Sequence, residues 1–373
     1  MIKVLQVVGG MNRAGAETML MNLYRNINRE AVQFDFLVYT DTQQDYENEI
    51  KSLGGNVIHM PCKPGWQMIF SIPKIRNILR KDSSYKAIHI HTLLNSVYPL
   101  LAATCVKGIK KITHSHSTHN TTYSSFIRTV YENISKFLIQ KLSDVYLACG
   151  QKAGEFLFGR TFNTRGKTIK NAIPFKQFCY DHSSTVAFLK KELNIDEELV
   201  IGSIARLEPV KNHAFMLLLA KELKERNIKF KFLIVGKGEL RQELEKQVRH
   251  YNLTQEVIFL GTRNDIPQLM HLFDVLLMPS LFEGTPVTLI EAQACMLPCL
   301  ISKNIPEDAD LKLGLIKQLS LDAPVRQWLE FILSHNRKNK PNVAQEVVRQ
   351  AFLYYGYDAE ESAKSMEKVY LGS

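Results

Sequence analysis

The sequence predicts an α/β protein with two domains, each a parallel β-sheet covered by helices. A chain of 373 residues is long for one domain and fits two domains of roughly 150–200 residues each. Short apolar runs alternate with helix-like segments through most of the chain, which is typical of parallel sheets. A polar stretch at residues 175–198 interrupts the alternation, and we interpret it as the connection between the domains.

The first half starts with an apolar strand and keeps the alternation up to a helix breaker at Pro174. Strands are expected where apolar residues run together, and helices where they recur at helical spacing. The expected strands are Ile2–Val8, Phe34–Val38, Val57–Met60, Ala87–His91, Lys111–His114, Val145–Cys149 and a short one within residues 169–173. The expected helices are Glu17–Ile27, Tyr46–Leu53, Ile72–Arg80, Ser96–Lys107, Ser125–Leu142 and Lys152–Phe158.

The second half repeats this organisation without repeating the sequence. Its expected strands are Val200–Ala205, Phe230–Val235, Val257–Leu260, Val275–Met278 and Leu300–Ser302. Its expected helices are Ala214–Arg226, Leu240–Tyr251, Ile266–Leu272, Val287–Met296, Trp328–Leu333, Ala344–Phe352 and Ala359–Leu371. Residues 354–358 break the pattern before the last helix.

The composition, 45% hydrophobic and 23% charged, is ordinary for a globular protein. No apolar run reaches the roughly 18 residues that a membrane-spanning helix needs, and the apolar run at Ile2–Val8 is too short for a secretory leader. The six cysteines contain no Cys-x2-Cys pair, which favours buried thiols in a reducing compartment. We therefore expect a cytoplasmic protein.

The basic charge is concentrated in the first half of the chain. Residues 1–173 hold 22 Lys and Arg against 11 Asp and Glu, whereas the remainder holds 47 − 22 = 25 against 37 − 11 = 26. A basic domain fits nucleic acid, an anionic membrane surface, or no partner at all. No aromatic–basic interleaving or reading helix stands out, so we expect no nucleic acid, and an anionic membrane surface or no partner stays open.

Two glutamates flank the turn that follows the strand Val275–Met278. Glu283 lies in the turn and Glu291 in the helix after it, while the free amides of Gly284 and Thr285 and the positive end of the helix dipole offer an anion site. A ligand with phosphate at one end and hydroxyls at the other satisfies both groups, and a nucleotide-sugar is such a ligand. Taken alone, two glutamates at this spacing are more often ordinary surface charges.

The run Phe282–Pro286 followed by Ile290–Ala292 resembles the donor-sugar motif of the retaining glycosyltransferases of family 4, which have the GT-B fold. The resemblance covers nearly the whole chain. Within the family, the chain is similar to the branch that builds bacterial exopolysaccharide or capsule. It implies two Rossmann-like domains facing across a cleft. Residues 1–173, joined by a returning helix at about 357–373, would bind the acceptor, and residues 174–356 would bind the nucleotide-sugar.

The resemblance also assigns donor-binding residues. Arg206 and Lys211 match the family's Arg-x4-Lys motif, in which two cations neutralise the leaving diphosphate. On the same basis Glu283 would accept hydrogen bonds from sugar hydroxyls and Glu291 from the ribose diol. The remaining expected donor contacts are backbone groups or turn residues: Gly10, Gly236, Arg263, Gly284 and Thr285.

The acceptor side is expected around the first loop and a group of histidines. Asn12 and Arg13 follow the glycine pair of that loop, and His91 and His116 follow two strand ends. In the resembling family the second histidine of the strand-end His-x-His faces the reacting sugar, which places His91 in the catalytic set. Zinc is an alternative for the histidines, but no cysteine accompanies them, and Asp308-Ala309-Asp310 lacks the strand expected before a metal-binding Asp-x-Asp. We expect no metal.

These features predict a retaining glycosyltransferase for hexosyl or N-acetylhexosaminyl groups, with a UDP-sugar donor and a glycan or lipid-linked acceptor. The resemblance implies a front-face mechanism in which the leaving phosphate helps to deprotonate the incoming hydroxyl. Two alternatives are a catalytically silent binding subunit of a glycan-assembly complex and a GT-B sugar epimerase or phosphorylase. The protein would lie in the cytoplasm or at the inner face of the plasma membrane.

Overall fold

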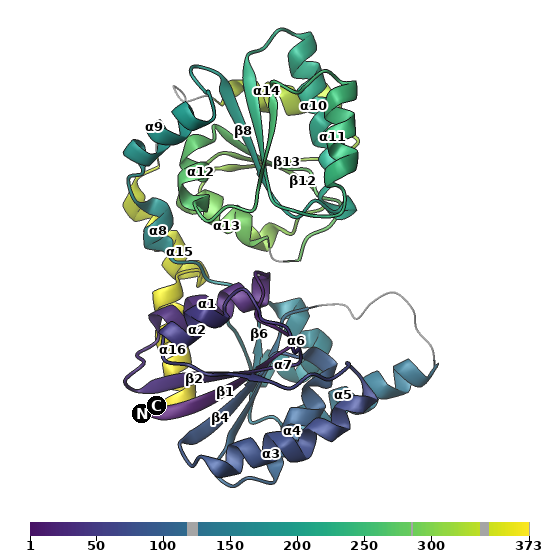
Figure 1. Cartoon of the computed structure of the whole chain (residues 1–373), viewed down its shortest axis with the longest axis vertical. Coiled ribbons are helices and arrows are strands. Elements are labelled where there is room, and N and C mark those ends of the chain that lie inside the picture. The colour runs from purple at the N-terminus through teal and green to yellow at the C-terminus, as the bar shows by residue number, and fades with distance from the viewer. Residues whose placement is uncertain (118–125, 285, 336–342, 373) are drawn as a thin grey trace. The chain divides into compact units, whose positions relative to one another are not determined.

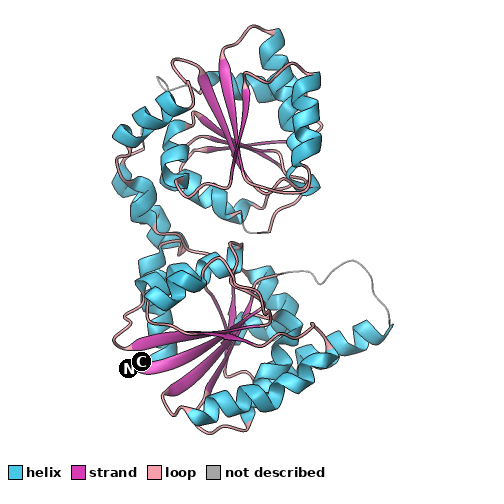
Figure 2. Cartoon of the chain, viewed as in Figure 1, coloured by secondary structure: helices cyan, strands magenta, loops and turns pink. Residues whose placement is uncertain are grey.

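The computed structural model describes residues 1–117, 126–284, 286–335 and 343–372. The chain forms two compact units, the first made of Met1–Ile173 with Gly356–Ser373 and the second of Pro174–Tyr355. Within each unit, strands form a central layer and helices lie on both of its faces (Figures 1 and 2). Among the described residues, no helix is both long and apolar enough to cross a bilayer.

The first unit is built on a parallel sheet whose strand order is β3-β2-β1-β4-β5-β6-β7. Its strands are β1 Ile2–Val8, β2 Val32–Val38, β3 Val57–His59, β4 Tyr85–Ile90, β5 Lys110–Ser115, β6 Val145–Ala148 and β7 Gly166–Thr168. The direction in which strands are added reverses between β1 and β4. In open parallel sheets, ligands bind beyond the carboxyl ends of the strands at such a reversal.

Helices cover both faces of this sheet because its central strands are apolar on both sides. One face packs against α1 Gly15–Asn26, α2 Glu47–Ser52 and α16 Ala359–Leu371. The other face packs against η1 Trp66–Ser71, α3 Ile72–Lys81, η2 Leu93–Ser96, α4 Val97–Thr104, α5 Phe126–Leu142, α6 Gln151–Phe158, η3 Gly159–Thr161 and α7 Phe162–Arg165. The two cores are therefore separate layers.

The second unit has the strand order β10-β9-β8-β11-β12-β13, again parallel. These strands are β8 Leu199–Ile204, β9 Phe230–Val235, β10 Val257–Gly261, β11 Val275–Met278, β12 Cys299–Ser302 and β13 Ile316–Leu319. One core is formed with α10 His213–Glu225, α11 Arg241–His250 and α14 Val325–Ser334. The remaining helical segments are α8 Phe175–Cys179, α9 Ser183–Glu192, η4 Pro209–Lys211, α12 Ile266–Leu272, α13 Val287–Ala294, η5 Glu307–Ala309 and α15 Gln345–Tyr355.

Helix α16 belongs to the first unit although it follows the second unit in the sequence. Its first backbone amides are capped by Asp358, whose side chain accepts hydrogen bonds from the amides of Glu360 and Glu361. Asp358 also bridges to Ile173. The predicted fold class, two Rossmann-like sheets with a returning last helix, is confirmed.

Two details of the sequence prediction are wrong. The short strand expected within residues 169–173 is instead β7, which ends at Thr168, and strand β13 was not expected. Both are edge strands of their sheets.

Candidate active site

The turn between β11 and α13 places Glu283 against Lys211, which lies in the turn after β8. The ammonium Nζ of Lys211 donates hydrogen bonds to both carboxylate oxygens of Glu283, each at 2.7 Å. The hydroxyl of Ser280 donates to the same carboxylate at 2.7 Å. The side chains of Lys211 and Glu283 are 19% and 9% exposed, so the pair is held in a fixed geometry close to solvent.

The two turns are joined by further hydrogen bonds. The amide of Leu281 donates to the carbonyl of Val210 at 2.8 Å, and the side-chain amide of Asn212 donates to the carbonyl of Pro279 at 3.2 Å. Asn212 adopts a left-handed conformation with φ of 55°, which asparagine tolerates better than most residues. Lys211 is therefore presented by a turn that is fastened to the turn carrying Glu283.

Arg206 lies in the loop after β8, five residues before Lys211. Its side chain is 74% exposed and forms an ion pair with Glu208 at 2.7 Å. An ion pair this exposed contributes little free energy. The guanidinium can therefore exchange Glu208 for another anion at small cost.

Glu291 lies inside helix α13 and is half-buried. Burial raises the pKa of its carboxyl group to about 7, because a charged group is less stable away from water. Near neutral pH the group can therefore either accept or donate a hydrogen bond.

Gly236 is the point at which the turn after β9 meets the turn after β8. Its φ is +136°, and a Cβ atom there would lie 2.0 Å from the carbonyl oxygen of Ala205. At Gly238 a Cβ would lie 2.4 Å from the carbonyl oxygen of Leu207. Glycine is therefore needed for close backbone packing beside Arg206, which by itself assigns no ligand.

Arg263, Gly284 and Thr285 are the residues predicted to contact the base and the sugar of the donor. The Arg263 guanidinium is engaged in a fork with Asp265, at 2.8 and 2.6 Å, and this contact lowers the pKa of Asp265. Its side chain is thus occupied, as expected if only its backbone contacts the base. A Cβ at Gly284 would meet open space, and Thr285 lies outside the described residues.

The first loop of the first unit is held by residues 44–45. A Cβ at Gly10 would lie 2.6 Å from Oε1 of Gln44. Asn12 accepts a hydrogen bond from the amide of Asp45 at 3.2 Å, and the amide of Arg13 donates to the carboxylate of Asp45 at 3.1 Å. These contacts fix the loop at the carboxyl end of β1.

His91 and His116 are brought together. Nδ1 of His91 lies 2.8 Å from Nε2 of His116, and Nε2 of His91 lies 3.0 Å from Oε1 of Gln6. Burial lowers the pKa of His116 to about 4, and burial with the neighbouring rings holds the pKa of His91 well below its ordinary value. Both ring nitrogens of His91 are occupied, so a direct contact with a sugar would have to replace one of them.

Sequence reasoning missed Ser280, Gln6 and Tyr370. The Tyr370 hydroxyl lies 2.7 Å from Nδ1 of His89 and 3.2 Å from the amide nitrogen of Gln6. Tyr370 and His89 are 281 residues apart in the sequence, and no local pattern signals such a contact. Nothing in the sequence distinguishes Ser280 from the other serines until its hydrogen bond to Glu283 is known.

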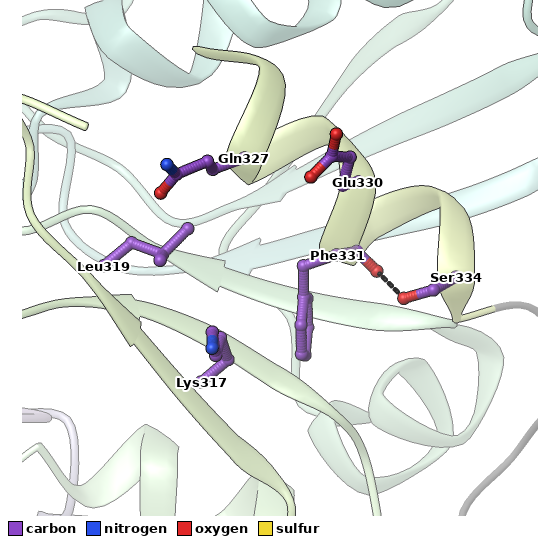
Figure 3. Close-up of a pocket in the computed structure, with 6 residues that line it drawn as sticks. All are labelled: Lys317, Leu319, Gln327, Glu330, Phe331 and Ser334. Carbon is purple, nitrogen blue, oxygen red and sulfur yellow. Dashed lines mark hydrogen bonds between the residues drawn. The ribbon is translucent and has the colours of Figure 1, made fainter. Parts of the chain in front are cut away.

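The hollows on the described surface include the following two. One, of about 690 Å³, follows strands β2 and β3 and is lined in part by Tyr39, Lys63, Trp66 and Phe70. Trp66 and Phe70 are 70% and 66% exposed. The other, of about 460 Å³, lies between β13 and α14 and contains none of the predicted site residues; Figure 3 shows its lining residues, Lys317, Leu319, Gln327, Glu330, Phe331 and Ser334.

The sequence matches glycosyltransferase families and individual glycosyltransferases along most of its length. The family model "Glycosyltransferase Family 4" matches residues 13–176, and the model "Glycosyl transferases group 1" matches residues 186–309. The chain is 38% identical over 370 residues to "Putative glycosyltransferase EpsF" of Bacillus subtilis (strain 168), covering 99% of this chain and 96% of the relative. It is 26% identical to "Capsular polysaccharide biosynthesis glycosyltransferase CapH" of Staphylococcus aureus, covering 83% and 84%.

Solved structures share the fold at low sequence identity. Anabaena Alr3699/HepE in complex with UDP superposes with a TM-score of 0.78 at 17% identity, and both chains are covered completely. A glycosyltransferase from Rickettsia africae ESF-5 superposes with a TM-score of 0.79 at 13% identity, covering 100% of this chain and 98% of the other.

Proposed function

Because the chain belongs to the glycosyltransferases of family 4, we propose that it transfers a hexosyl or N-acetylhexosaminyl group from a UDP-sugar to a glycan or lipid-linked acceptor, with retention at the anomeric carbon. Cell-surface polysaccharide synthesis is the proposed setting, since EpsF covers the same length and CapH is described by its role in capsular polysaccharide. UDP is the proposed nucleotide because HepE, which has the same fold, binds it.

The observation that carries this proposal is the Lys211–Glu283 pair with its Ser280 support. A cation and an anion in contact can bind the two ends of an activated sugar, the ammonium holding phosphate and the carboxylate holding sugar hydroxyls. Charge develops on the leaving phosphate in the transition state, so the ammonium stabilises the transition state more than the bound donor. Arg206 would leave Glu208 and add a two-pronged contact to the same phosphate.

The other donor contacts follow from the same arrangement. Glu291 would bind the ribose diol, and the backbones of Gly236 and Arg263 would line the nucleotide. Gly10, Gly284 and Thr285 complete the set as proposed phosphate and sugar contacts. Two cations suffice to neutralise the diphosphate, so the proposed reaction uses no metal cofactor.

The acceptor would bind to the first unit. Asn12 and Arg13 lie in a loop that is held at the carboxyl end of β1, and the exposed rings of Trp66 and Phe70 offer flat apolar surfaces to a sugar ring. His91 and His116 would shape this side from the ends of β4 and β5.

A transfer assay tests the proposal. Purified protein is incubated with UDP-sugars and a panel of soluble and lipid-linked glycans, and the anomeric configuration of the product is determined by NMR. Transfer with retention is expected, whereas a silent subunit would bind UDP-sugar without turnover, and an epimerase or phosphorylase would consume donor without acceptor. Lys312→Ala serves as a control, because Lys312 is 60% exposed and pairs only locally with Asp310.

Helix α5 supports an anionic membrane as a further partner. Phe126, Val130, Ile134 and Phe137 recur along one side of this helix and are 84%, 40%, 55% and 59% exposed. An apolar stripe with basic neighbours, in a segment 1–173 that holds 22 Lys and Arg against 11 Asp and Glu, fits the interface of an anionic bilayer. The proposed location is therefore the inner face of the plasma membrane.

Vesicle flotation tests this location. Binding to vesicles of phosphatidylglycerol is expected, with weaker binding to neutral vesicles and for the Phe137→Asp variant. Tyr354→Asp, which changes an 84% exposed ring in the second unit, should bind like the unchanged protein. Equal binding by all three proteins would reject α5 as the contact.

A further inference from the structure

Two neighbouring strands of the first unit each end in His-x-His. His89 lies in β4 and His91 follows it, and His114 lies in β5, which pairs with β4 in parallel, with His116 just beyond its end. Residues two apart on a strand point to the same face, and here that face is the one covered by α1 and α16, because His89 contacts Tyr370 of α16. The four imidazoles therefore form one cluster, with neighbouring ring centroids 4.1–5.4 Å apart.

Several ring nitrogens in this cluster have no hydrogen-bond partner among the described residues. They are Nε2 of His89, both nitrogens of His114 and Nδ1 of His116. The side chains of His89 and His114 are fully buried. Leaving a buried polar group unsatisfied costs roughly 1–3 kcal/mol, and native proteins seldom leave several such groups at one place. The unsatisfied nitrogens point to a shared ligand.

The occupied nitrogens are held in a way that suits metal binding. The amide nitrogen of Gln6 donates to Tyr370, so its Oε1 accepts from His91 and fixes the proton of His91 on Nε2. Nδ1 of His91 then carries no proton and accepts a hydrogen bond from Nε2 of His116 at 2.8 Å, a bond that a shared metal ion would replace. Nδ1 of His89 is held by the Tyr370 hydroxyl. Ligand histidines in metalloproteins are oriented by such a partner on the nitrogen that does not bind the metal.

We propose that His89, His91 and His114 bind a divalent transition-metal ion of the zinc class, with His116 as the fourth ligand. One ring nitrogen of each of the first three lies within 4.8 Å of the others, and Nε2 of His116 lies 2.8 Å from Nδ1 of His91. Bond lengths to zinc of roughly 2.0–2.1 Å require the rings to rotate inward by about an ångström. Two imidazoles on one tetrahedral ion have centroids roughly 5 Å apart, within the range seen here.

The protonation of the cluster agrees with this geometry. Burial and the neighbouring rings keep the pKa values of His89 and His114 well below the ordinary value. Neutral imidazole is the form that binds metal. A donor set of nitrogen alone favours zinc, copper or nickel and disfavours magnesium and manganese.

The ion would be structural. It would tie the carboxyl ends of β4 and β5 to each other and, through Gln6 and Tyr370, to β1 and α16. It would hold the His91 ring that shapes the acceptor side, and it takes no part in stabilising the diphosphate.

Direct metal analysis tests the site. Protein without a histidine tag is dialysed against a chelator, then titrated with Zn²⁺ or Co²⁺ and passed over a desalting column. One bound ion per chain is expected by elemental analysis, and the Co²⁺ form should show the intense visible absorption of a four-coordinate ion. His114→Ala should lose the bound ion, and Tyr370→Phe should weaken binding roughly 10–100-fold.

His59→Ala is the matched control, because His59 is an exposed histidine of the same unit that pairs with Glu47 at 3.2 Å. It should bind one ion with unchanged affinity. Circular dichroism of each variant verifies folding, and the titration of the unchanged protein decides the question even where a variant fails to fold. Absence of a bound ion after desalting, or equal binding by the unchanged protein and a folded His114→Ala variant, would overturn the site.

Discussion

Replacing Lys211 by methionine removes the ammonium group that donates to both oxygens of Glu283, while keeping most of the apolar stem. The carboxylate is 9% exposed and, among the described residues, would keep the Ser280 hydroxyl as its hydrogen-bond partner. Removing one member of a buried ion pair lowers the free energy of unfolding by about 3–5 kcal/mol. Because the lysine side chain is 19% exposed, the expected loss of stability lies at or below the lower end of this range. We expect about 2–3 kcal/mol.

This loss should be local, because Lys211 and Glu283 hold two turns together. The amide of Leu281, which donates to the Val210 carbonyl at 2.8 Å, reports on the same junction. Hydrogen exchange in a peptide containing residue 281 should become about 10²-fold faster in Lys211→Met, since roughly 1.4 kcal/mol corresponds to tenfold. The control Lys312→Met should leave this exchange unchanged.

The double variant Lys211→Met, Glu283→Gln separates stability from catalysis. Neutralising both partners should restore most of the protection of the Leu281 amide, because no uncompensated charge remains. Turnover should stay about 10²-fold or more below the unchanged enzyme, as in each single variant, since the contact with the leaving phosphate is still missing. Recovery of turnover in the double variant would refute the proposed roles, and unchanged exchange in Lys211→Met would refute the structural argument.

Three further outcomes are expected. Burial raises the pKa of Glu291 to about 7 from its ordinary value of 4.5, so a contribution to stability of about 3 kcal/mol is present below pH 4.5 and is lost between pH 4.5 and 7, as the carboxyl group ionises. Urea unfolding of Glu291→Gln should lack that slope, and an identical slope would contradict the burial argument. Arg206→Ala should lower turnover by about 10–10²-fold without changing the unfolding midpoint, since its pair with Glu208 is exposed; full activity would remove it from the site. Added Mg²⁺ or Mn²⁺ should leave the rate of transfer unchanged, and a dependence on either ion would mean that the two cations do not suffice.

The sequence predicted the central strands of both sheets because each is a continuous apolar run, buried on both faces. It missed β13 and misplaced β7 because edge strands are partly exposed and carry polar residues: β7 is Gly-Lys-Thr and β13 is Ile-Lys-Gln-Leu. Local pattern alone cannot separate such segments from loops.

In the candidate site, the residues could be predicted from the sequence, whereas the contacts between them could not. Glu283, Glu291, Arg206 and Lys211 could be named because their motifs are local and resemble those of a known family. The direct contact between Lys211 and Glu283, 72 residues apart, depends on the pairing of β8 with β11, which no local motif specifies. The link from Gln6 through Tyr370 to His89 is longer still, and only the returned helix α16 reveals it.

The position of α16 has a consequence for biosynthesis. Ala363, Met366 and Tyr370 complete a core that also contains Val4, Leu20 and Phe34, yet the ribosome makes them after the whole second unit. Until α16 is synthesised, residues 1–173 therefore lack the helix that covers part of this core. Residues 174–355 can finish folding first, so the order of maturation is inverted relative to the order of translation.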